Sequence, residues 1–535
     1  MSNQSDKQKT ARSLAGIAGI VAVATLISKV FGLVRQQAIA AAFGIGIAYD
    51  AYNYAYIVPS FLFVLLGGIN GPFHSAIVSV LAKRDKSEAA PIVETITTLV
   101  GGVLVLFTIV IILFAGVFID LVAPGLTQQV RTLAIEQLQI MAPMAVLAGL
   151  IGIGFGTLNA ADMYWLPSVS PLFSSITLIG GLGILVLQLG NNVIEPQYAR
   201  LGGIVLAWGT LSGAILQWFV QLAAQWRAGM GTLHLRFNWK LPGVSEVLKI
   251  LGPATLSSGM LQINLYTDLF FASYIPGAAA GMGYAGLLVQ TPLGIISNVI
   301  LVPLLPVFSR LAAPENWPEL KERIRQGILL TALTMLPLGA LMMTLAFPIV
   351  RVVYERGAFQ QNDSQMVGSL LIAYGVGMFV YLARDVLVRV FYALGDGNTP
   401  FRVSIVNIFL NGLLDYILIK PLGAPGLILA TVTVNFISTI ALLWLLARKL
   451  DGLPLWEWTW PIVGLTAISF IAGLASWGVD WGFHRFWSTD AFLIHLVQLS
   501  LAGIVGLGVF ALLVTQLNLP EVDIFVSRIR QKLGR

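Results

Sequence analysis

The sequence has no cysteine, four scattered histidines and few charged residues among its 535 positions. Without cysteine, disulfides, thiolate metal sites and cysteine nucleophiles are excluded, and the histidines show no metal-ligand spacing. Charged residues make up 10% of the chain, whereas a soluble protein carries about 25%. The composition therefore excludes a soluble enzyme, a disordered chain and a nucleic-acid-binding protein.

Apolar runs fill most of the chain, and hydrophobic residues make up 57% of it. The runs last about 20 residues or more, the length of a helix that crosses a bilayer and satisfies its own backbone groups. The shorter, alternating segments of a membrane barrel are absent. We therefore predict an all-α polytopic membrane protein whose fourteen spans lie near residues 14–43, 51–81, 92–122, 132–158, 166–189, 199–226, 247–273, 281–309, 325–350, 366–394, 401–420, 424–447, 459–479 and 491–516.

Lysine and arginine are unevenly shared between the two sides of the predicted membrane. The loops on the side of the N-terminus hold far more of them than the opposite loops do, and such residues mark cytoplasmic loops. We therefore expect both termini in the cytoplasm. The basic residues on the opposite side are Arg131, Arg200, Arg351, Arg356, Lys420 and Arg485.

A weak internal repeat suggests two similar halves. Arg35 and Pro59 match Asp268 and Pro292 at an offset of 233 residues, and Phe155 matches Phe391 at an offset of 236. Such repeats are typical of transporters that bind substrate between their halves. We predict a cytoplasmic tail (1–13), an N-lobe of spans 1 to 6 (14–226), a cytoplasmic interfacial linker (227–246), a C-lobe of spans 7 to 12 (247–450), spans 13 and 14 (451–517) and a basic cytoplasmic tail (518–535).

Lys29 and Arg35 lie inside the first predicted span and flank Gly32. Ionisable groups within a span are costly unless they are paired or hydrated, so they indicate function. On a straight helix the two side chains lie about 120° apart, and a kink at Gly32 would aim both into one cavity. We interpret them as a cationic site for a phosphate-bearing substrate. The alternative is that they reach the membrane surface or pair locally with Asp50.

Other polar groups within spans have simpler explanations. The tenth span carries Arg384, Asp385 and Arg389, and a structural ion cluster near the cytoplasmic end is the favoured interpretation. His74 follows Pro72 at a stretch that glycine and proline mark as bent. It is most simply a satisfied polar residue.

Asp268 and Asp415 lie in the seventh and eleventh spans with no basic residue within a helical turn. Asn411 stands one turn before Asp415 on the same face, and Thr431 in the next span can approach both. Carboxylate, amide and hydroxyl oxygens suit hard cations, which makes Na⁺ or H⁺ the natural candidate. The alternative is a protonated aspartate bonded to the neighbouring backbone.

Several segments together resemble the MurJ (MviN) family of lipid II flippases, in the multidrug/oligosaccharidyl-lipid/polysaccharide exporter superfamily. The resemblance runs from about residue 14 to residue 450 in order and spacing. Its segments are Ser28-Lys-Val-Phe-Gly-Leu-Val-Arg35, Phe43-Gly-Ile-Gly, Tyr49-Asp50-Ala51-Tyr52, Leu158-Asn159-Ala160, Leu166-Pro167-Ser168, Tyr354-Glu-Arg-Gly-Ala-Phe359 and Phe391-Tyr-Ala-Leu-Gly-Asp-Gly-Asn-Thr-Pro400.

The resemblance implies two six-helix lobes around a central cavity, with spans 13 and 14 forming a groove for a lipid tail. It implies that undecaprenyl-pyrophosphate-linked disaccharide-pentapeptide moves from the cytoplasmic to the outer leaflet of a bacterial plasma membrane by alternating access. This chain departs from the family at Phe63 and Leu287, where the family has arginine, and at Gln290, where it has an acidic residue. The candidate substrate-binding residues are Lys29, Arg35, Asp50, Ser60, His74, Gln290, Arg384 and Arg389.

The resemblance also implies a sodium site, which is the one cofactor expected and would serve as a coupling ion. Its residues match Asp268, Asn411, Asp415 and Thr431, with a backbone carbonyl from Leu427. Expected partners are the lipid-linked precursor, membrane lipids and cell-wall synthesis or division proteins, with the protein itself a monomer.

Two other functions stay open. One is a related exporter of another cargo, either a drug antiporter or a polysaccharide-lipid flippase. The other is a non-transporting scaffold in a cell-wall complex, for which the charged residues of the spans would be dispensable. No nucleophile–base pair, cofactor loop or metal cluster points to an enzyme.

Overall fold

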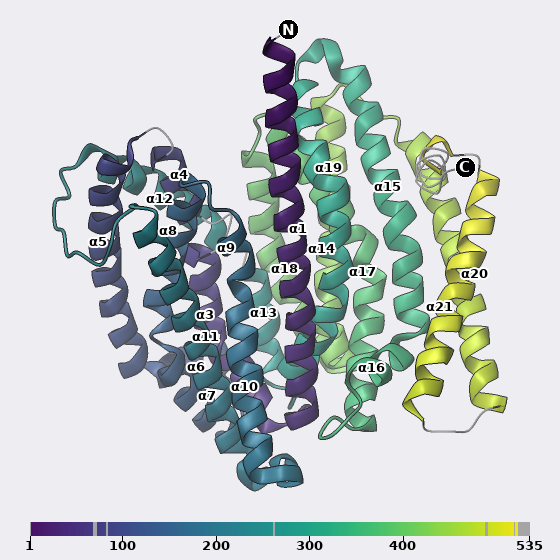
Figure 1. Ribbon diagram of the computed structural model, residues 1–535. Helices are drawn as coiled ribbons and strands as arrows, with labels where there is room; N and C mark the ends of the chain where they lie inside the picture. The colour runs from purple at the N-terminus through teal and green to yellow at the C-terminus, as the bar shows by residue number, and fades with distance from the viewer. Residues whose placement is uncertain are drawn as a thin grey trace. The chain divides into compact units, whose positions relative to one another are not determined.

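The computed structural model describes residues 2–67, 72–81, 84–260, 263–486, 491–517 and 519–522. These residues are almost entirely helical and contain no strand (Figure 1), which confirms the all-α prediction. The chain forms two compact units. The first comprises the residues up to Ala280 together with Arg356–Phe359, and the second comprises Gly281–Glu355 and the residues from Gln360 onward.

The first unit is built from long helices joined by short turns. Several short helices make up the expected second span. Helix α14 begins in this unit at Ala278, but it is described with the second unit. The elements are α1 (Ser2–Phe43), α2 (Ile47–Ala55), α3 (Ile57–Leu62), η1 (Phe63–Gly67), α4 (Pro72–Leu81), α5 (Lys86–Leu113), α6 (Ala115–Val122), α7 (Gln128–Met141), α8 (Met144–Ala160), α9 (Trp165–Val169), α10 (Pro171–Leu189), η2 (Gly190–Ile194), η3 (Pro196–Tyr198), α11 (Ala199–Arg227), α12 (Pro242–Met260) and α13 (Ile263–Ala272).

The second unit has longer and less interrupted helices. Its elements are α14 (Ala278–Arg310), η4 (Pro314–Asn316), α15 (Trp317–Thr344), α16 (Ala346–Tyr354), α17 (Gln361–Ala393), α18 (Asn398–Leu422), α19 (Ala424–Lys449), α20 (Leu455–Phe486), α21 (Phe492–Val514) and η5 (Thr515–Leu517).

Eleven helical segments of the described chain are long and apolar enough to cross a membrane, and α7 with α8, bent by 43° at their junction, would make a twelfth. This confirms a multi-span membrane protein, and the count of fourteen stays a prediction. The expected first span falls in α1, and the expected seventh falls in α12 and α13, on either side of residues 261 and 262, which lie outside the described residues. The lobe boundaries stay predictions too, and residues 523–535 of the predicted C-terminal tail lie outside the described part.

The expected second span is not one regular helix. It is divided into α2 and α3, a π-helix at Phe63–Gly67 and α4. The π-helix lies so close to α8 that a Cβ atom added at Gly152 would meet the carbonyl oxygen of Leu66 at 1.9 Å. Glycine is therefore required at position 152, and π-helical turns often mark functional sites in long helices. The family arginine position, Phe63, begins this turn.

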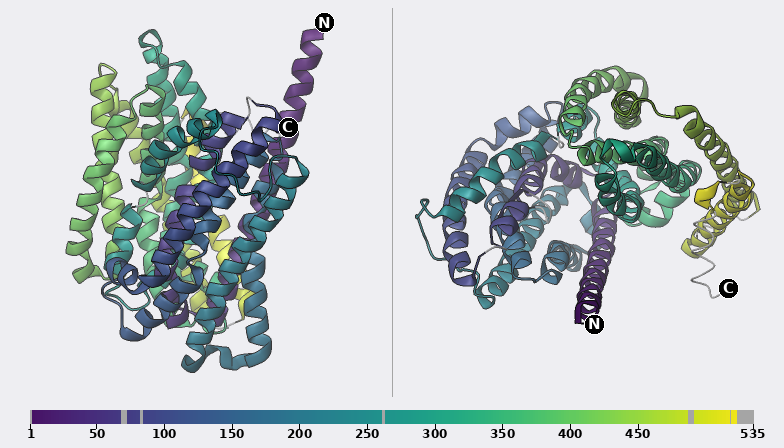
Figure 2. Two further views of the ribbon diagram at one scale, coloured as in Figure 1. Left: turned by 90° about the vertical axis from the view of Figure 1, so that its left-hand side faces the viewer. Right: turned by 90° about the horizontal axis from the view of Figure 1, so that it is seen from above.

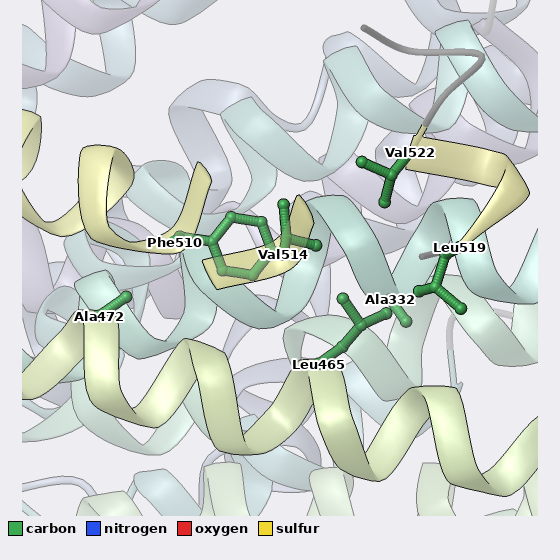
Figure 3. Packing of buried hydrophobic residues seen from close by; sticks show 7 residues of the cluster. All are labelled: Ala332, Leu465, Ala472, Phe510, Val514, Leu519 and Val522. Atoms are coloured by element: carbon green, nitrogen blue, oxygen red, sulfur yellow. The ribbon is translucent and has the colours of Figure 1, made fainter. Parts of the chain in front are cut away.

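The last two long helices pack on α15 within the second unit. Figure 3 shows the cluster that Leu465 and Ala472 of α20 and Phe510 of α21 form with Ala332 of α15, in which Leu465 lies beside Ala332. Inside a bilayer, helices associate through close packing and hydrogen bonds rather than through hydrophobic transfer. Small residues such as Ala332 and Ala472 allow the close packing. One hydrogen bond joins α20 to α21, in which the Ser476 hydroxyl donates to the Ala502 carbonyl at 2.7 Å.

The turn between α17 and α18 is fastened by Asp396. Its carboxylate accepts hydrogen bonds from the backbone and hydroxyl of Thr399 at 3.0 and 2.8 Å and pairs with Lys449 of α19 at 2.6 Å. Burial of Asp396 opposes its ionisation, but these hydrogen bonds outweigh burial and hold its pKa below the ordinary value of 3.8. Residues 391–400, which carry part of the family resemblance, thus include a residue, Asp396, that stabilises this turn.

The depressed pKa of Asp396 predicts an acid-sensitive contribution to stability. The contribution is fully present above pH 3.8, the pKa of the unfolded chain, and is lost as pH falls through the lower folded pKa. Because both side chains are partly exposed, we expect it to be modest, about 1 kcal/mol. The melting temperatures of the wild type and of Asp396→Asn should differ at pH 5–7, and the difference should shrink as pH falls below 3.8. Equal melting temperatures at pH 7 would contradict this assignment.

Candidate functional site

Lys29 and Arg35 lie deep in the first predicted span. Helix α1 passes Gly32 without interruption, so no helix break brings the two side chains onto one face. Lys29 is 14 residues from the end of α1 at Phe43, which is about 21 Å along the axis. Long basic side chains reach the membrane surface only from positions near helix ends. The Lys29 side chain is exposed, and because the ends of α1 do not mark the membrane surface, reaching that surface remains the alternative interpretation.

Neither basic residue forms an ion pair within the described part of the chain. The guanidinium of Arg35 acts electrostatically on the phenols of Tyr49, Tyr52 and Tyr56. These rings stack along α2, with ring centroids 6.1 and 5.5 Å apart. The environment of Arg35 is therefore aromatic and hydroxyl-bearing, without a carboxylate that would neutralise it.

Asp50 is not the partner of these basic residues. Its carboxylate is 4% exposed and accepts hydrogen bonds from the backbone N–H groups of Gly277 at 3.1 Å and Ala280 at 3.2 Å. These groups begin α14, where a helix has unsatisfied donors and a partial positive charge. Asp50 of α2 thus caps α14 from another helix. Local pairing of Lys29 or Arg35 with Asp50 is not seen.

Replacing Asp50 with alanine should destabilise the protein. Two buried N–H groups at the start of α14 would lose their acceptor, at a cost of about 2–4 kcal/mol. Asp50→Asn keeps an acceptor oxygen and should recover part of the loss. Thermal unfolding in detergent provides the measurement. A wild-type melting temperature for Asp50→Ala would show that the cap contributes nothing.

Ser60 and His74 each have a partner within the first unit. The Ser60 hydroxyl donates to the Ile57 carbonyl at 2.9 Å and also contacts the phenol of Tyr266. His74 Nε2 lies 2.7 Å from the side-chain nitrogen of Asn159 in α8. The interpretation of His74 as a satisfied polar residue agrees with this contact.

The second unit holds two arginines inside α17. Arg384 donates to the hydroxyls of Ser438 at 3.1 Å and Ser404 at 3.3 Å, and Arg389 donates to the Leu301 carbonyl at 3.2 Å. Neither makes a salt bridge with an N–O distance of 4 Å or less in the described chain, but the Asp385 carboxylate interacts electrostatically with both guanidinium groups, which agrees with the predicted ion cluster. The hydrogen bonds of both arginines go to neutral acceptors. Gln290 of α14 is exposed.

Four of the five residues predicted to bind sodium lie together on α18 and α19. Asn411 and Asp415 are fully buried. The Asn411 amide donates to Asp415 Oδ2 at 2.9 Å, and the Thr431 hydroxyl donates to Asn411 Oδ1 at 3.1 Å. Leu427 is buried one turn before Thr431. This donor set of side-chain oxygens fits a hard cation. Asp268 of α13, also buried, belongs to the first unit.

Two polar features were not found from the sequence. A cavity of about 570 Å³ in the second unit is lined by Arg351, Glu355, Trp477 and Asp480 among others, and contains none of the predicted residues. Glu94 of α5 binds the predicted linker. An acidic residue inside the third predicted span, with arginine in the linker, was a signal that could have identified this contact.

The comparisons with known proteins agree with the motifs. A family model described as lipid II flippase MurJ matches residues 39–498. A relative from Synechocystis sp., described as a probable lipid II flippase MurJ, is 59% identical over 527 residues, which cover 98% of this chain and 99% of the relative.

Two solved structures show the fold. A lipid II flippase MurJ in an inward closed conformation has a TM-score of 0.74 at 22% identity, covering 96% of this chain and 99% of that one. An inward-facing multidrug resistance MATE family transporter of the MOP superfamily has a TM-score of 0.59 at 18% identity, covering 81% of this chain and 99% of that one. Because the family model spans most of the chain and a close relative matches it nearly end to end, the chain belongs to the lipid II flippase MurJ family.

Proposed function

We propose that this protein is a lipid II flippase, which moves undecaprenyl-pyrophosphate-linked disaccharide-pentapeptide from the cytoplasmic to the outer leaflet of the bacterial plasma membrane. Family membership supports the cargo and the membrane. The observation that carries the mechanism is Lys29 and Arg35 deep in α1, without an ion-pairing carboxylate in the described chain. A cation that is not internally neutralised favours an anionic ligand.

We propose that the pyrophosphate binds Lys29 and Arg35 and is then exposed outward by alternating access. Arg35 forms charge-assisted hydrogen bonds with phosphate oxygens, for which its planar guanidinium is well shaped. In the second unit, Arg384 and Arg389 are further candidates for the anion, because their present acceptors are neutral. They would offset the arginines that the chain lacks at Phe63 and Leu287. Gln290, Ser60 and His74 stay candidates for the polar parts of the cargo.

The membrane potential is a proposed driving force. With the cytoplasmic side negative, moving one negative charge outward gains roughly 2.3 kcal/mol per 100 mV. An anionic cargo therefore gains directly from the potential, and the empty carrier needs a separate return step. This argument rests on the proposed orientation with both termini in the cytoplasm, which the distribution of basic residues supports.

Sodium is the proposed ion for that return step. When bound, it would supply a compact positive charge between oxygen ligands. Asn411, Asp415 and Thr431 of the second unit would hold it with the Leu427 carbonyl, and the role expected for Asp268 stays a prediction. The side-chain oxygens that lie together on α18 and α19 support this, because such ligands suit a hard cation.

Reconstitution in liposomes tests the cargo. Purified protein should move fluorescent lipid II between leaflets faster than protein-free liposomes do, and the rate should rise with a potential that is negative on the side of origin. Expression should also restore growth to cells depleted of their own lipid II flippase. Transport of a polysaccharide lipid or a drug but not lipid II would favour a related exporter. Growth rescue without any lipid movement would favour a scaffold. Cell-wall synthesis partners and a monomeric state stay predictions.

A further inference from the structure

The predicted linker between α11 and α12 has two chemically different sides. From Thr232 to Lys240, polar and apolar residues alternate. The apolar side chains of Leu235, Phe237 and Trp239 are 78%, 71% and 69% exposed. In an extended chain, alternate side chains point to opposite sides. We call residues 231–241 the amphipathic linker.

The polar side of the amphipathic linker is fastened to Glu94 of α5. The carboxylate accepts hydrogen bonds from the backbone and hydroxyl of Thr232 at 2.9 and 3.0 Å, and Arg236 Nε donates to it at 2.5 Å. His234 Nδ1 lies 3.3 Å from the same carboxylate. One turn along α5, the Thr98 hydroxyl accepts a hydrogen bond from the Arg236 backbone at 3.1 Å. Five contacts thus hold one side of the linker against α5.

Glu94 lies on a side of α5 that otherwise faces outward. Ile112 is 18 residues further on, which is five full turns, so it lies directly in line with Glu94. Ile112 and Val105, which is about 20° from that line, are 37% and 48% exposed. Residues 92–96, by contrast, are buried all around the helix. The amphipathic linker therefore covers a carboxylate that would otherwise face the acyl chains.

The chain reaches α5 through two glycines in the left-handed region. Gly229 and Gly231 have φ values of +72° and +104°. A Cβ atom at Gly231 would also meet the Ala90 carbonyl oxygen at 3.2 Å and Glu94 Cγ at 3.3 Å. Figures 1 and 2 show the segment after α11 running on the outer side of α5, away from the other helices of the first unit. The backbone thus positions the linker at the rim of this unit.

Basic residues border the apolar side. Arg227, Lys240 and Lys249 are exposed at the ends of the amphipathic linker and in the following helix. Exposed tryptophan and phenylalanine next to lysine and arginine are typical of segments that lie in the membrane interface, where basic groups attract anionic lipid headgroups.

We propose that the amphipathic linker is a membrane-binding element that lies in the interface of the cytoplasmic leaflet. Leu235, Phe237 and Trp239 contact acyl chains, and the flanking basic residues contact anionic headgroups. The contacts with Glu94 hold the element against the bilayer and keep the third span's carboxylate away from lipid. The proposal does not depend on the cargo.

The absence of native cysteine allows a direct test, because each introduced cysteine is unique. Leu235→Cys and Phe237→Cys proteins carry a fluorescent label and are reconstituted in neutral or anionic phospholipid vesicles. Glu315→Cys, exposed in the α14–α15 turn, is the matched control. We expect lipids with a nitroxide near the headgroup to quench the two linker labels severalfold more than the control label. Aqueous iodide should do the reverse.

Anionic vesicles should increase lipid quenching of the linker labels, and Arg227→Gln with Lys240→Gln should remove that increase. Iodide quenching equal to that of the Glu315→Cys control would overturn the proposal, because the linker would then lie in water. Protection from both quenchers would also overturn it, since protein would then cover the linker. Equal lipid quenching in neutral and anionic vesicles would overturn the role of the headgroups.

Discussion

Replacing Arg35 with alanine is expected to slow lipid II flipping by about a hundredfold in reconstituted liposomes. The charge-assisted hydrogen bonds that this residue would give to pyrophosphate are each worth about 1.5–3 kcal/mol, and 1.4 kcal/mol corresponds to a factor of ten. Because Arg35 forms no salt bridge in the described chain, its loss leaves no buried carboxylate unpaired. The variant should therefore fold and insert normally.

Three further variants serve as controls in this experiment. Arg35→Lys keeps the charge but loses the planar pair of donors, so an intermediate rate is expected. Lys29→Ala together with Arg35→Ala should abolish flipping. Arg200→Ala removes a guanidinium that is 73% exposed and paired with Glu136, and it should flip at the wild-type rate. A wild-type rate for the Lys29 and Arg35 double variant would refute the cationic site.

The helical architecture could be predicted from the sequence because it depends on one property, the length of the apolar runs. Each run must satisfy its own backbone groups in lipid, which permits only helices here. The interruption of the second span could be anticipated from Gly67 and Pro72, but the π-helix could not. It depends on how closely Gly152 of another helix lets the Leu66 carbonyl approach, and a single sequence does not record that distance.

The candidate site was predictable where its members are close in sequence. Asn411 and Asp415 share a face because four residues make about one turn, and the adjoining helix brings Thr431 to them. Partners far apart in sequence were not predictable. Arg384 is bound by Ser404 and Ser438 of two other helices.

The role of Asp50 could not be predicted from the sequence either, because its hydrogen-bond donors lie far from it along the chain. Pairing of this residue with Lys29 or Arg35 was the alternative interpretation, yet it caps α14, more than 200 residues away. A carboxylate near basic residues in sequence suggests an ion pair, but backbone donors at a distant helix start compete for it.

Replacing Asp415 with asparagine is expected to abolish stabilisation of the protein by sodium. Any ligand that binds only the folded state stabilises it by RT ln(1 + [L]/Kd), which is about 1.4 kcal/mol at ten times Kd. Wild-type protein should therefore melt at a higher temperature in NaCl than in KCl of equal ionic strength. Asp415→Asn should melt at the same temperature in both salts.

The melting temperatures in KCl, without sodium, test a second expectation, in which the order of the two proteins is reversed. Asp415 is fully buried, and a buried carboxylate without a cation costs more than a neutral amide. In KCl, Asp415→Asn should therefore melt at or above the wild-type temperature, although it melts below the wild type in NaCl. Thr431→Val should weaken the sodium response. Thr433→Val should leave it unchanged, because the Thr433 hydroxyl bonds to the Leu429 carbonyl of its own helix. Equal melting of the wild type in the two salts would mean that these oxygens bind no sodium, and the return of the empty carrier would then need another driving force.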